Sequence, residues 1–321
     1  MNQPCDSKFM HHATTSSNGQ PPVTFRPGTA GDSYAVFVVF EQTLADLLQR
    51  TGNQEPAGVH DQESLAQMWE DRRSLYEHLA QSADEFWVAE QGDAVVGFAR
   101  SVVRDGLQAL TELFVRPEAQ SAGVGSGLLA RALPQGRAGS RLIIASPDVR
   151  AQAQYIRAGL TPRFPVYYCY RAPRAVALPT GIRWAPVTEA EADLTQLAAI
   201  DRAVIGHSRS VDHRWLLGDR DGWFYHKQGR LIGYGYTGRR NGPFALLETG
   251  AFAEVLTHAE ARAAAAGRTH FGVETPGANH EALAHLLANG FHIDPFLAIL
   301  LADHPCDRWA RYLLTSPPFI W

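Results

Sequence analysis

Hydrophobic and polar positions in the first half of the chain follow the spacing of helices in some stretches and of strands in others. Two helical stretches come early, and three apolar runs of strand length follow them. The predicted elements are a strand with a turn at 23–31, helices around 35–49 and 65–83, strands at 86–90, 94–103 and 109–115, a helix at 123–133, a strand at 141–145, a helix at 147–158 and a strand at 166–170. This order predicts a mixed α/β domain and argues against a doubly wound one.

A weaker copy of this pattern follows a proline-rich junction at 173–179. Short landmarks of the first half recur in the second half in the same order, which indicates duplication. The recurring pairs are Arg26-Pro27-Gly28-Thr29 with Ala185-Pro186-Val187-Thr188, Val96-Gly97-Phe98 with Ile232-Gly233-Tyr234, and Ala158-Gly159-Leu160 with Asn289-Gly290-Phe291. Gly97 and Gly159 are 62 positions apart, whereas Gly233 and Gly290 are 57 apart, so the second copy lacks about five residues in this interval.

The length and composition of the chain suit more than one domain, since it has 321 residues of which 45% are hydrophobic. Its first residues are polar and contain no apolar core of signal-peptide length, so we expect disorder there. Its last residues are apolar, so we expect them to dock on a domain. The expected division is a disordered lead at 1–22, a first domain at 23–172, a linker at 173–179, a second domain at 180–303 and a C-terminal tail at 304–321.

Charge and cysteine usage narrow the classes of partner. The formal net charge is −4, and the 29 basic residues form no block, which argues against nucleic acid or an anionic membrane as a partner. No apolar run approaches the length of a membrane span. Cys5, Cys169 and Cys306 lie far apart and match neither a zinc spacing nor a disulfide framework. We therefore expect a cytoplasmic protein without a metal cofactor.

A glycine-rich loop between a strand and a helix is the strongest candidate for a binding site. It reads Gln120-Ser121-Ala122-Gly123-Val124-Gly125 and follows the strand that ends at Val115. Alternate glycines let a bulky anion approach the backbone, and the first amides of a helix lack internal partners and favour phosphate. The alternative is that these glycines only allow close packing. A dinucleotide fingerprint is excluded because its third glycine would fall at Leu128, and no Walker lysine follows.

The loop resembles that of the GNAT superfamily (GCN5-related N-acetyltransferases), whose pattern is Gln/Arg-x-x-Gly-x-Gly/Ala. The preceding Val115-Arg116-Pro117-Glu118 is also similar to that superfamily, and the similarity covers roughly residues 23–172. The resemblance implies an α/β fold (an α+β mixed sheet) built as two tandem GNAT-like acyltransferase domains. It further implies that the first copy is intact, that the second is degenerate, and that acetyl-CoA is the cosubstrate.

The resemblance also implies which residues hold the cofactor. In the family, the loop amides hold the CoA pyrophosphate, while the strand before them splays from its neighbour and pairs with the pantetheine arm. Splaying leaves backbone donors free for the pantetheine amides and the thioester carbonyl. The implied pantetheine contacts are Leu113, Phe114, Val115 and Asp148, the last in place of the usual asparagine. The implied pyrophosphate contacts are Ser121, Ala122, Gly123, Val124, Gly125 and Ser126, and Gln120, which begins the loop, is also an implied cofactor contact.

Acyl transfer from a thioester to an amine needs a group that takes the amine's proton and one that protonates the departing thiolate. The family commonly uses a tyrosine in a run Asn-x-x-Ala-x-x-x-Tyr-x-x-x-Gly-Phe. Tyr155 falls on that tyrosine, with Leu160 in place of the phenylalanine. Glu112, on the strand expected to splay, is the candidate base, and its alternatives are a surface position or a salt bridge. The other candidates are Glu85, Arg104, Asp105 and ordered water.

The second copy departs from the family at both of these features. The stretch from Gly242 to Gly250 leads into a helix without the glycine loop, and Leu286 stands in the tyrosine's place. We therefore expect no CoA binding there. The segment at 201–225 is rich in polar and aromatic residues and is expected to line a substrate cleft or to form a contact between the domains. Its histidines fit no compact metal site.

The resemblance to the GNAT superfamily implies an N-acetyltransferase that moves an acetyl group from acetyl-CoA to a primary amine of a small molecule or peptide, by direct attack in a ternary complex. The alternative is a non-catalytic acyl-CoA-binding sensor or regulatory module. Short acyl groups other than acetyl remain open, because packing alone sets the size of an acyl pocket. In the family the variable early helices recognise the acceptor, and we expect the second domain to contribute here; neither segment has a pattern that identifies a substrate.

Overall fold

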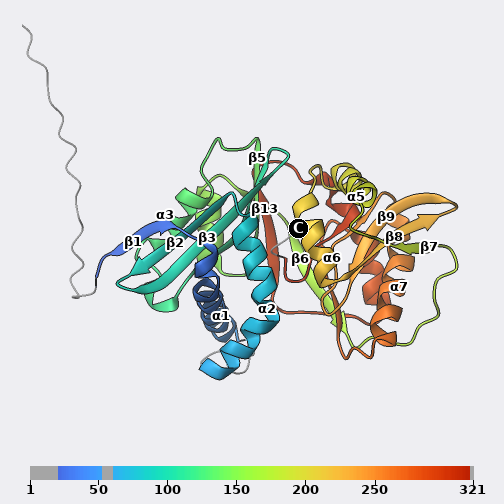
Figure 1. Cartoon of the computed structure of the whole chain (residues 1–321), viewed down its shortest axis with the longest axis horizontal. Coiled ribbons are helices and arrows are strands. Elements are labelled where there is room, and N and C mark those ends of the chain that lie inside the picture. Colours follow the sequence, from blue (N-terminus) through green and yellow to red (C-terminus); the bar gives the residue numbers. More distant parts are fainter. Residues whose placement is uncertain (1–20, 53–60, 319–321) are drawn as a thin grey trace, which may run out of the picture.

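The computed structural model describes residues 21–52 and 61–318. The lead expected at 1–22 lies outside these residues except for its last two positions, and so does the end of the expected tail at 319–321. Figure 1 shows two lobes side by side, with strands β6 and β13 between them. The first lobe is coloured blue to green and the second yellow to red.

The first half contains helices and strands in the order that the spacing predicts. They are β1 (Val23–Pro27), α1 (Ser33–Arg50), α2 (Gln62–Ser82), β2 (Glu85–Gln91), β3 (Ala94–Arg104), β4 (Leu107–Val115), α3 (Val124–Ala132), β5 (Ser140–Ala145), α4 (Val149–Arg157) and β6 (Thr161–Arg171). Local chemistry sets several boundaries: Asp61 caps α2 by accepting from the Ser64 amide at 2.8 Å, and Gly123 begins α3 in the left-handed conformation with φ of +81°. Strand β6 begins at Thr161, five residues before the predicted 166–170, and it includes Pro162 and Pro165.

The second half repeats this order of elements. They are β7 (Arg183–Pro186), α5 (Glu191–Val204), α6 (Ser210–Asp219), β8 (Asp221–Lys227), β9 (Arg230–Thr237), β10 (Phe244–Leu246), α7 (Phe252–Ala265), β11 (Phe271–Pro276), α8 (His280–Ala288), β12 (His292–Ile293), β13 (Ala298–Ala302) and β14 (Tyr312–Leu313). The mixed α/β fold expected for both copies is confirmed, and so is the internal duplication of the elements.

The strands form two sheets that do not divide at the expected linker. One sheet has nine strands in the order β1-β2-β3-β4-β5-β13-β6-β11, with β12 also paired to β6. The other has five in the order β14-β10-β9-β8-β7. Strand β13, near the end of the chain, lies between β5 and β6, so that Leu300 opposes Ile144 on one side and Phe164 on the other. A strand of the second half thus completes the sheet of the first.

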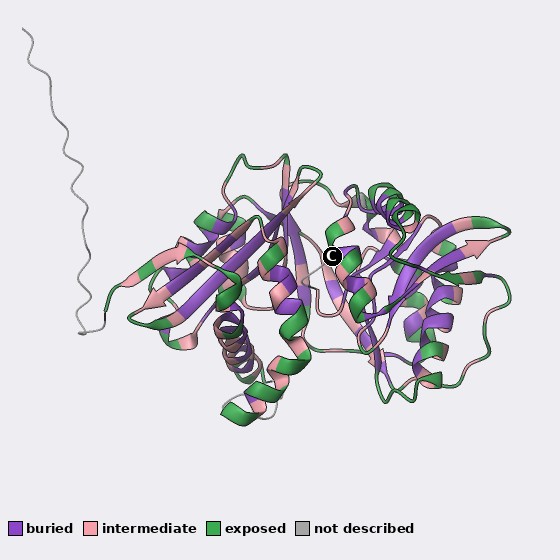
Figure 2. Cartoon of the chain, viewed as in Figure 1, coloured by how far each residue is buried: buried purple, intermediate pink, exposed green. Residues whose placement is uncertain are grey.

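The apolar cores follow the same arrangement. Helices α1 and α2 cover one face of the first half's sheet, around Phe37 and Tyr76, while α3 and α4 cover the other face. Leu301 of β13 is fully buried in this second core, among side chains of the first half. Figure 2 shows that β13, at the boundary between the lobes, is largely buried, whereas the neighbouring β6 is mostly half-buried. The two halves therefore share core as well as sheet.

Residues 201–225 form a contact between the halves, which was one of the two expectations for this segment. Asp212 of α6 lies 2.9 Å from the His78 ring, and the Trp215 indole donates to Ser74 at 2.9 Å. Inside the second half, the buried carboxylate of Asp201 accepts from His213 at 2.9 Å and pairs with Arg209 at 3.3 Å. Burial alone would raise the pKa of Asp201, but the charges of Arg209 and His213 outweigh it and hold this pKa below its usual value.

The C-terminal tail packs on both halves. Strand β14 pairs with β10, and the Leu314 amide donates to the Glu274 carbonyl at 3.0 Å. Pro317 and Pro318 then reach a cavity at the boundary of the halves. In the part of the chain that the structure describes, no helix is both long enough and apolar enough to cross a membrane.

Candidate functional site

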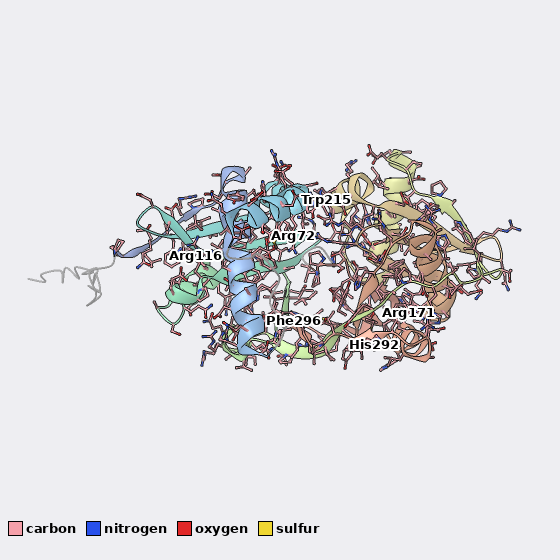
Figure 3. All side chains as sticks on the ribbon, turned by 90° about the horizontal axis from the view of Figure 1, so that it is seen from below. Arg72, Arg116, Arg171, Trp215, His292 and Phe296 are labelled. Atoms are coloured by element: carbon pink, nitrogen blue, oxygen red, sulfur yellow. The ribbon has the colours of Figure 1, made fainter. Side chains whose placement is uncertain are left out.

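A cavity of about 470 Å³ lies where α1, β4, β5 and α4 of the first half meet β11, β13 and the tail. Phe296, which precedes β13, lies where the halves meet (Figure 3). The first half lines the cavity with Phe40, Thr43, Leu44, Leu47, Leu48, Arg50, Thr111, Glu112, Leu113, Phe114, Val115, Gln120, Ser121, Gly125, Ile143, Ile144, Ala145, Ser146, Asp148, Arg150, Ala151, Gln154 and Tyr155. The second half and the tail add Glu274, Phe296, Ala298, Pro317 and Pro318.

The cavity exists because β4 and β5 separate halfway along their length. They pair in parallel only from Leu107 with Ser140 to Leu110 with Ile143. At Thr111 the register between β3 and β4 shifts by one residue, a β-bulge that bends the strand, and β4 is paired only with β3 beyond it. The splay expected from the family resemblance is therefore present. It leaves one edge of residues 111–115 facing the cavity.

The glycine loop has the geometry of an anion-binding helix start. The first backbone bond of α3 runs from the Gly127 amide to the Gly123 carbonyl at 2.9 Å, so the amides of Val124, Gly125 and Ser126 have no intrahelical partner. Ser121 also has a positive φ, of 65°. Such turns direct successive amides toward one side, where they and the helix dipole favour an anion.

The predicted loop residues do not all face the cavity with their side chains. Gln120, Ser121 and Gly125 line it. Ala122 and Gly123 are exposed, and the Val124 side chain is 2% exposed and packs in the core, so only its backbone is free to serve a ligand. Ser126 is not among the lining residues. The role of this loop therefore rests on its backbone.

Asp148 is occupied as the N-cap of α4. Its carboxylate accepts from the Arg150 amide at 2.9 Å and forms ion pairs with the Arg150 and Arg50 guanidinium groups at 3.0 and 3.4 Å. Burial raises the pKa of Asp148, but the hydrogen bonds from Arg150 outweigh it and keep the pKa below the usual value. Arg150 also donates to the Gln120 side chain at 2.8 Å. Two arginines thus stand at the loop end of the cavity.

Tyr155 lies on the inner face of α4 and lines the cavity while its side chain is only 3% exposed. Burial, and to a smaller extent the charge of Asp148, raise the pKa of Tyr155 above its ordinary value. The phenol therefore keeps its proton at neutral pH. A buried, protonated phenol beside a cavity has the chemistry of a proton donor.

Glu112 also lines the cavity, yet it is committed to an ion pair. Its carboxylate lies 3.1 Å from the Arg100 guanidinium, and both side chains are fully buried. Burial raises the pKa of Glu112, although Arg100 opposes this shift. Of the two alternatives to a base, the salt bridge is present and the surface position is wrong, because Glu112 is buried; its role as a base stays a prediction. The alternative candidates Glu85, Arg104 and Asp105 do not line the cavity, and Glu85 and Asp105 pair with Arg137 and Arg202 respectively.

The sequence patterns missed the wall that the second half supplies. Glu274 is a half-buried carboxylate in the otherwise largely buried strand β11, and that charge was the available signal. Nothing in the sequence around Phe296, Ala298, Pro317 and Pro318 predicted a place at the cavity, because only the fold brings these residues near the glycine loop. The apolar wall from α1, around Phe40 and Leu44, was likewise not predicted.

Comparison with known proteins agrees with this geometry. Residues 82–159 match the family model described as Acetyltransferase (GNAT) domain. No curated protein matches the chain by sequence. A proposed acetyltransferase from Pyrococcus horikoshii superposes with a TM-score of 0.69 at 15% identity, covering 95% of this chain and 97% of the other.

Two further solved structures share the fold. A tandem GNAT protein from the clavulanic acid biosynthesis pathway has a TM-score of 0.56 at 15% identity and covers 88% of this chain and 99% of its own. A GCN5-related N-acetyltransferase from Sphaerobacter thermophilus has a TM-score of 0.55 at 14% identity and covers 88% of this chain and 96% of its own. Residues 82–159, which contain the glycine loop and Tyr155, thus match a GNAT acetyltransferase domain, and the chain as a whole shares its fold with a tandem GNAT protein.

Proposed function

We propose that this protein is an acetyl-CoA-dependent N-acetyltransferase whose acceptor is a primary amine of a small molecule or peptide. One observation carries the proposal: a single cavity joins the start of α3, the unpaired edge of β4 and the Tyr155 phenol. An anion site, a row of free backbone groups and a proton donor are the three parts that transfer from a CoA thioester requires. The acyltransferase class follows from the GNAT domain itself.

In this proposal the cofactor lies along the first half's side of the cavity. The amides of residues 121–126 hold the pyrophosphate, and Arg50 and Arg150, at the same end, supply positive charge. Leu113, Phe114 and Val115 offer the open edge of β4 to the pantetheine arm. Val115 has fewer free backbone groups for the pantetheine arm than Leu113 and Phe114, because its carbonyl already accepts from the Gln120 side chain at 2.9 Å. Asp148 acts by holding Arg50 and Arg150 in place rather than by touching pantetheine.

The chemistry is direct attack in a ternary complex. The amine nitrogen forms a bond to the thioester carbonyl carbon, and the C–S bond breaks with its electron pair passing to sulfur. Tyr155 then gives its proton to that sulfur, which a phenol of raised pKa can do while it is protonated at neutral pH. The proton that the amine loses passes to a carboxylate at the cavity, for which Glu112 is the candidate from the sequence.

The second half has no counterpart of these parts. Strand β10 leads through Thr249–Ala251 into α7 without the glycine loop, and Leu286, in the place of the tyrosine, is fully buried in the apolar core. We therefore propose that residues 23–172 form the catalytic GNAT unit and residues 180–303 a degenerate one. A cytoplasmic location, which the widely spaced cysteines favour, belongs to the same proposal.

Calorimetric titration with acetyl-CoA tests the loop and the number of sites together. We expect one site per chain, and we expect Gly125→Glu to abolish binding because its carboxylate would meet the pyrophosphate. The change is sterically tolerable, since the nearest atom to an added Cβ is the flexible Gln154 side chain at 3.3 Å. The matched control is Gly250→Glu, which places the same charge at the start of α7, where an added Cβ has no atom within 4 Å.

Unchanged affinity in a folded Gly125→Glu protein would contradict the assignment of the loop. Two sites per chain, or a loss of binding in Gly250→Glu, would contradict the degenerate second half. Turnover is followed as free CoA thiol released in the presence of primary amines. Acetyl-CoA binding without amine-dependent thiol release would favour the non-catalytic acyl-CoA sensor.

A further inference from the structure

We infer that Glu274, a residue of the second half, is the carboxylate that binds the cationic amine acceptor and takes up its proton. The inference rests on the proposed function, because it assigns the acceptor end of the same cavity. It begins with the charged side chains that line that cavity. These are the arginines Arg50 and Arg150 and the carboxylates Glu112, Asp148 and Glu274.

Glu274 differs from the other two carboxylates in its partners. Asp148 is paired with two arginines, and Glu112 is paired with the buried Arg100. Among residues 21–52 and 61–318, Glu274 forms no ion pair with any basic side chain. Once it has lost its proton, its carboxylate is the negative charge at the cavity that a cationic ligand meets without competition from a guanidinium group.

The fold holds Glu274 firmly in place. Strand β11 is hydrogen-bonded to β6, where Glu274 opposes Tyr168, and the Glu274 carbonyl accepts from the Leu314 amide on its other side. Both edges of this residue are therefore paired, which limits backbone motion. A base must be held within hydrogen-bond reach of the proton it removes, and a doubly paired strand provides such a fixed position.

The surroundings of Glu274 suit an amine on an uncharged stem. Phe296, Ala298, Pro317 and Pro318 form an apolar wall around the same part of the cavity. The nearby Asp294 adds negative charge, whereas Ser316 donates a hydrogen bond to the carboxylate. An ammonium group is attracted to such a site, while a carboxylate beside the amine is repelled. The acceptor class is therefore a primary amine without an adjacent carboxylate.

The proton balance of the step is complete with these groups. Glu274 takes one proton from the ammonium ion, and the neutral nitrogen forms its bond to the acyl carbon. The C–S bond breaks, the sulfur takes the proton of Tyr155, and the second amine proton leaves the nitrogen through solvent and restores the phenol. The products are an amide, free CoA thiol and a protonated Glu274, which loses its proton to water.

The pKa of Glu274 suits this task. Burial and the charge of Asp294 raise it to about 8, against the opposing hydrogen bond from Ser316. The other titratable groups beside this carboxylate are Tyr168, which opposes it across the strands, and Cys169, whose pKa burial raises and the charge of Glu274 raises further; Tyr155 and Glu112 line the same cavity. Because kcat/KM reports the free enzyme, it should rise as the pH passes about 8 and the carboxylate loses its proton.

The test compares wild type with Glu274→Gln, using acetyl-CoA and two matched sets of amines. One set is 2-phenylethylamine, benzylamine and tyramine, and the other is phenylalanine, phenylglycine and tyrosine, which add a carboxylate beside the amine. We expect wild type to prefer the first set and Glu274→Gln to lower kcat/KM by about 10²- to 10⁴-fold. The exposed Glu281, replaced by Gln, is the control and should change nothing.

Two further readouts separate a base from a structural residue. The rise of kcat/KM near pH 8 should appear with amines of different pKa and disappear in Glu274→Gln, while calorimetry shows unchanged acetyl-CoA affinity. Amine turnover that survives in Glu274→Gln with the same pH profile would overturn this inference and leave the proposed function intact. If wild type binds acetyl-CoA and acylates no amine of either set, the proposed function and the inference fall together.

Discussion

Replacing Leu301 with alanine should destabilise the first half of the protein from a position near the end of the chain. Leu301 belongs to β13, yet its fully buried side chain packs in the core of the first half, under α3 and α4. Its neighbour Leu300 packs in a second cluster that joins Leu142 of β5 to Tyr234 of β9. The two halves should therefore unfold as one cooperative unit.

The expected magnitude follows from the burial of Leu301. Leucine to alanine removes three carbons, worth about 0.8 kcal/mol each in transfer free energy. The cavity that the substitution leaves collapses poorly, because β13 is hydrogen-bonded to β5 on one side and β6 on the other, and this brings the total loss of stability to about 3–5 kcal/mol. For a chain of this size the entropy of unfolding is ~0.6 kcal/mol/K, so Tm should fall by ~5–8 °C. Leu287→Ala, at a side chain 50% exposed, should cost less than about 0.5 kcal/mol.

Thermal unfolding gives the Tm shift, and hydrogen exchange locates it. Peptides that cover β5 should lose protection in Leu301→Ala, because β5 is hydrogen-bonded to β13 from Leu142 to Ala145. Two separate unfolding transitions, or unchanged protection of β5 alongside a weakened second half, would refute the reasoning that β13 is part of the first half's core.

Two other predictions concern the acid and the pH dependence of stability. Tyr155→Phe keeps the ring but removes the proton, so kcat should fall by about 10²- to 10⁴-fold at unchanged acetyl-CoA affinity; near-normal kcat with a rate-limiting chemical step would make Tyr155 a packing residue. Burial and the charge of Arg262 lower the pKa of His258 to about 4, so the folded protein should lose stability as the pH falls from about 6.5 toward 4. The drop in Tm between pH 7 and pH 5 should be smaller in His258→Phe, and an equal drop would show that His258 does not carry it.

Local features of the site were open to prediction because they depend on a few neighbouring residues. Gly123 at the start of α3 has the positive φ that its type allows, and Asp148 caps α4 as acidic residues commonly do. The order of helices and strands was predictable for the same reason, since each element's spacing extends over one short window. The assignment of residues to CoA came only with the family resemblance.

The pairing of Glu112 with Arg100 shows where local reasoning stops. In a regular hairpin, the register set by Ser101 opposite Leu110 would place Arg100 opposite Thr111. The bulge inserts Thr111 as an extra residue and moves Glu112 opposite Arg100. No pattern of apolar residues announces a bulge, so the sequence left open whether Glu112 forms a salt bridge. The position of Glu274 was hidden for a different reason: it depends on pairing between strands more than 100 residues apart.

The shared sheet explains how the second half contributes to a cavity whose proposed cofactor elements lie in the first half. What the second copy lacks, the glycine loop and the tyrosine, are the parts that we propose to hold CoA and to protonate its thiolate. What it retains are β13, which fills the place between β5 and β6, and β11, which carries Glu274 to the cavity. Without β13, strands β5 and β6 would each expose an unpaired edge, and the core around Leu301 would open to water. The second half is therefore a structural requirement for the cavity, which is the physical reason to expect one cofactor site from two copies of the fold.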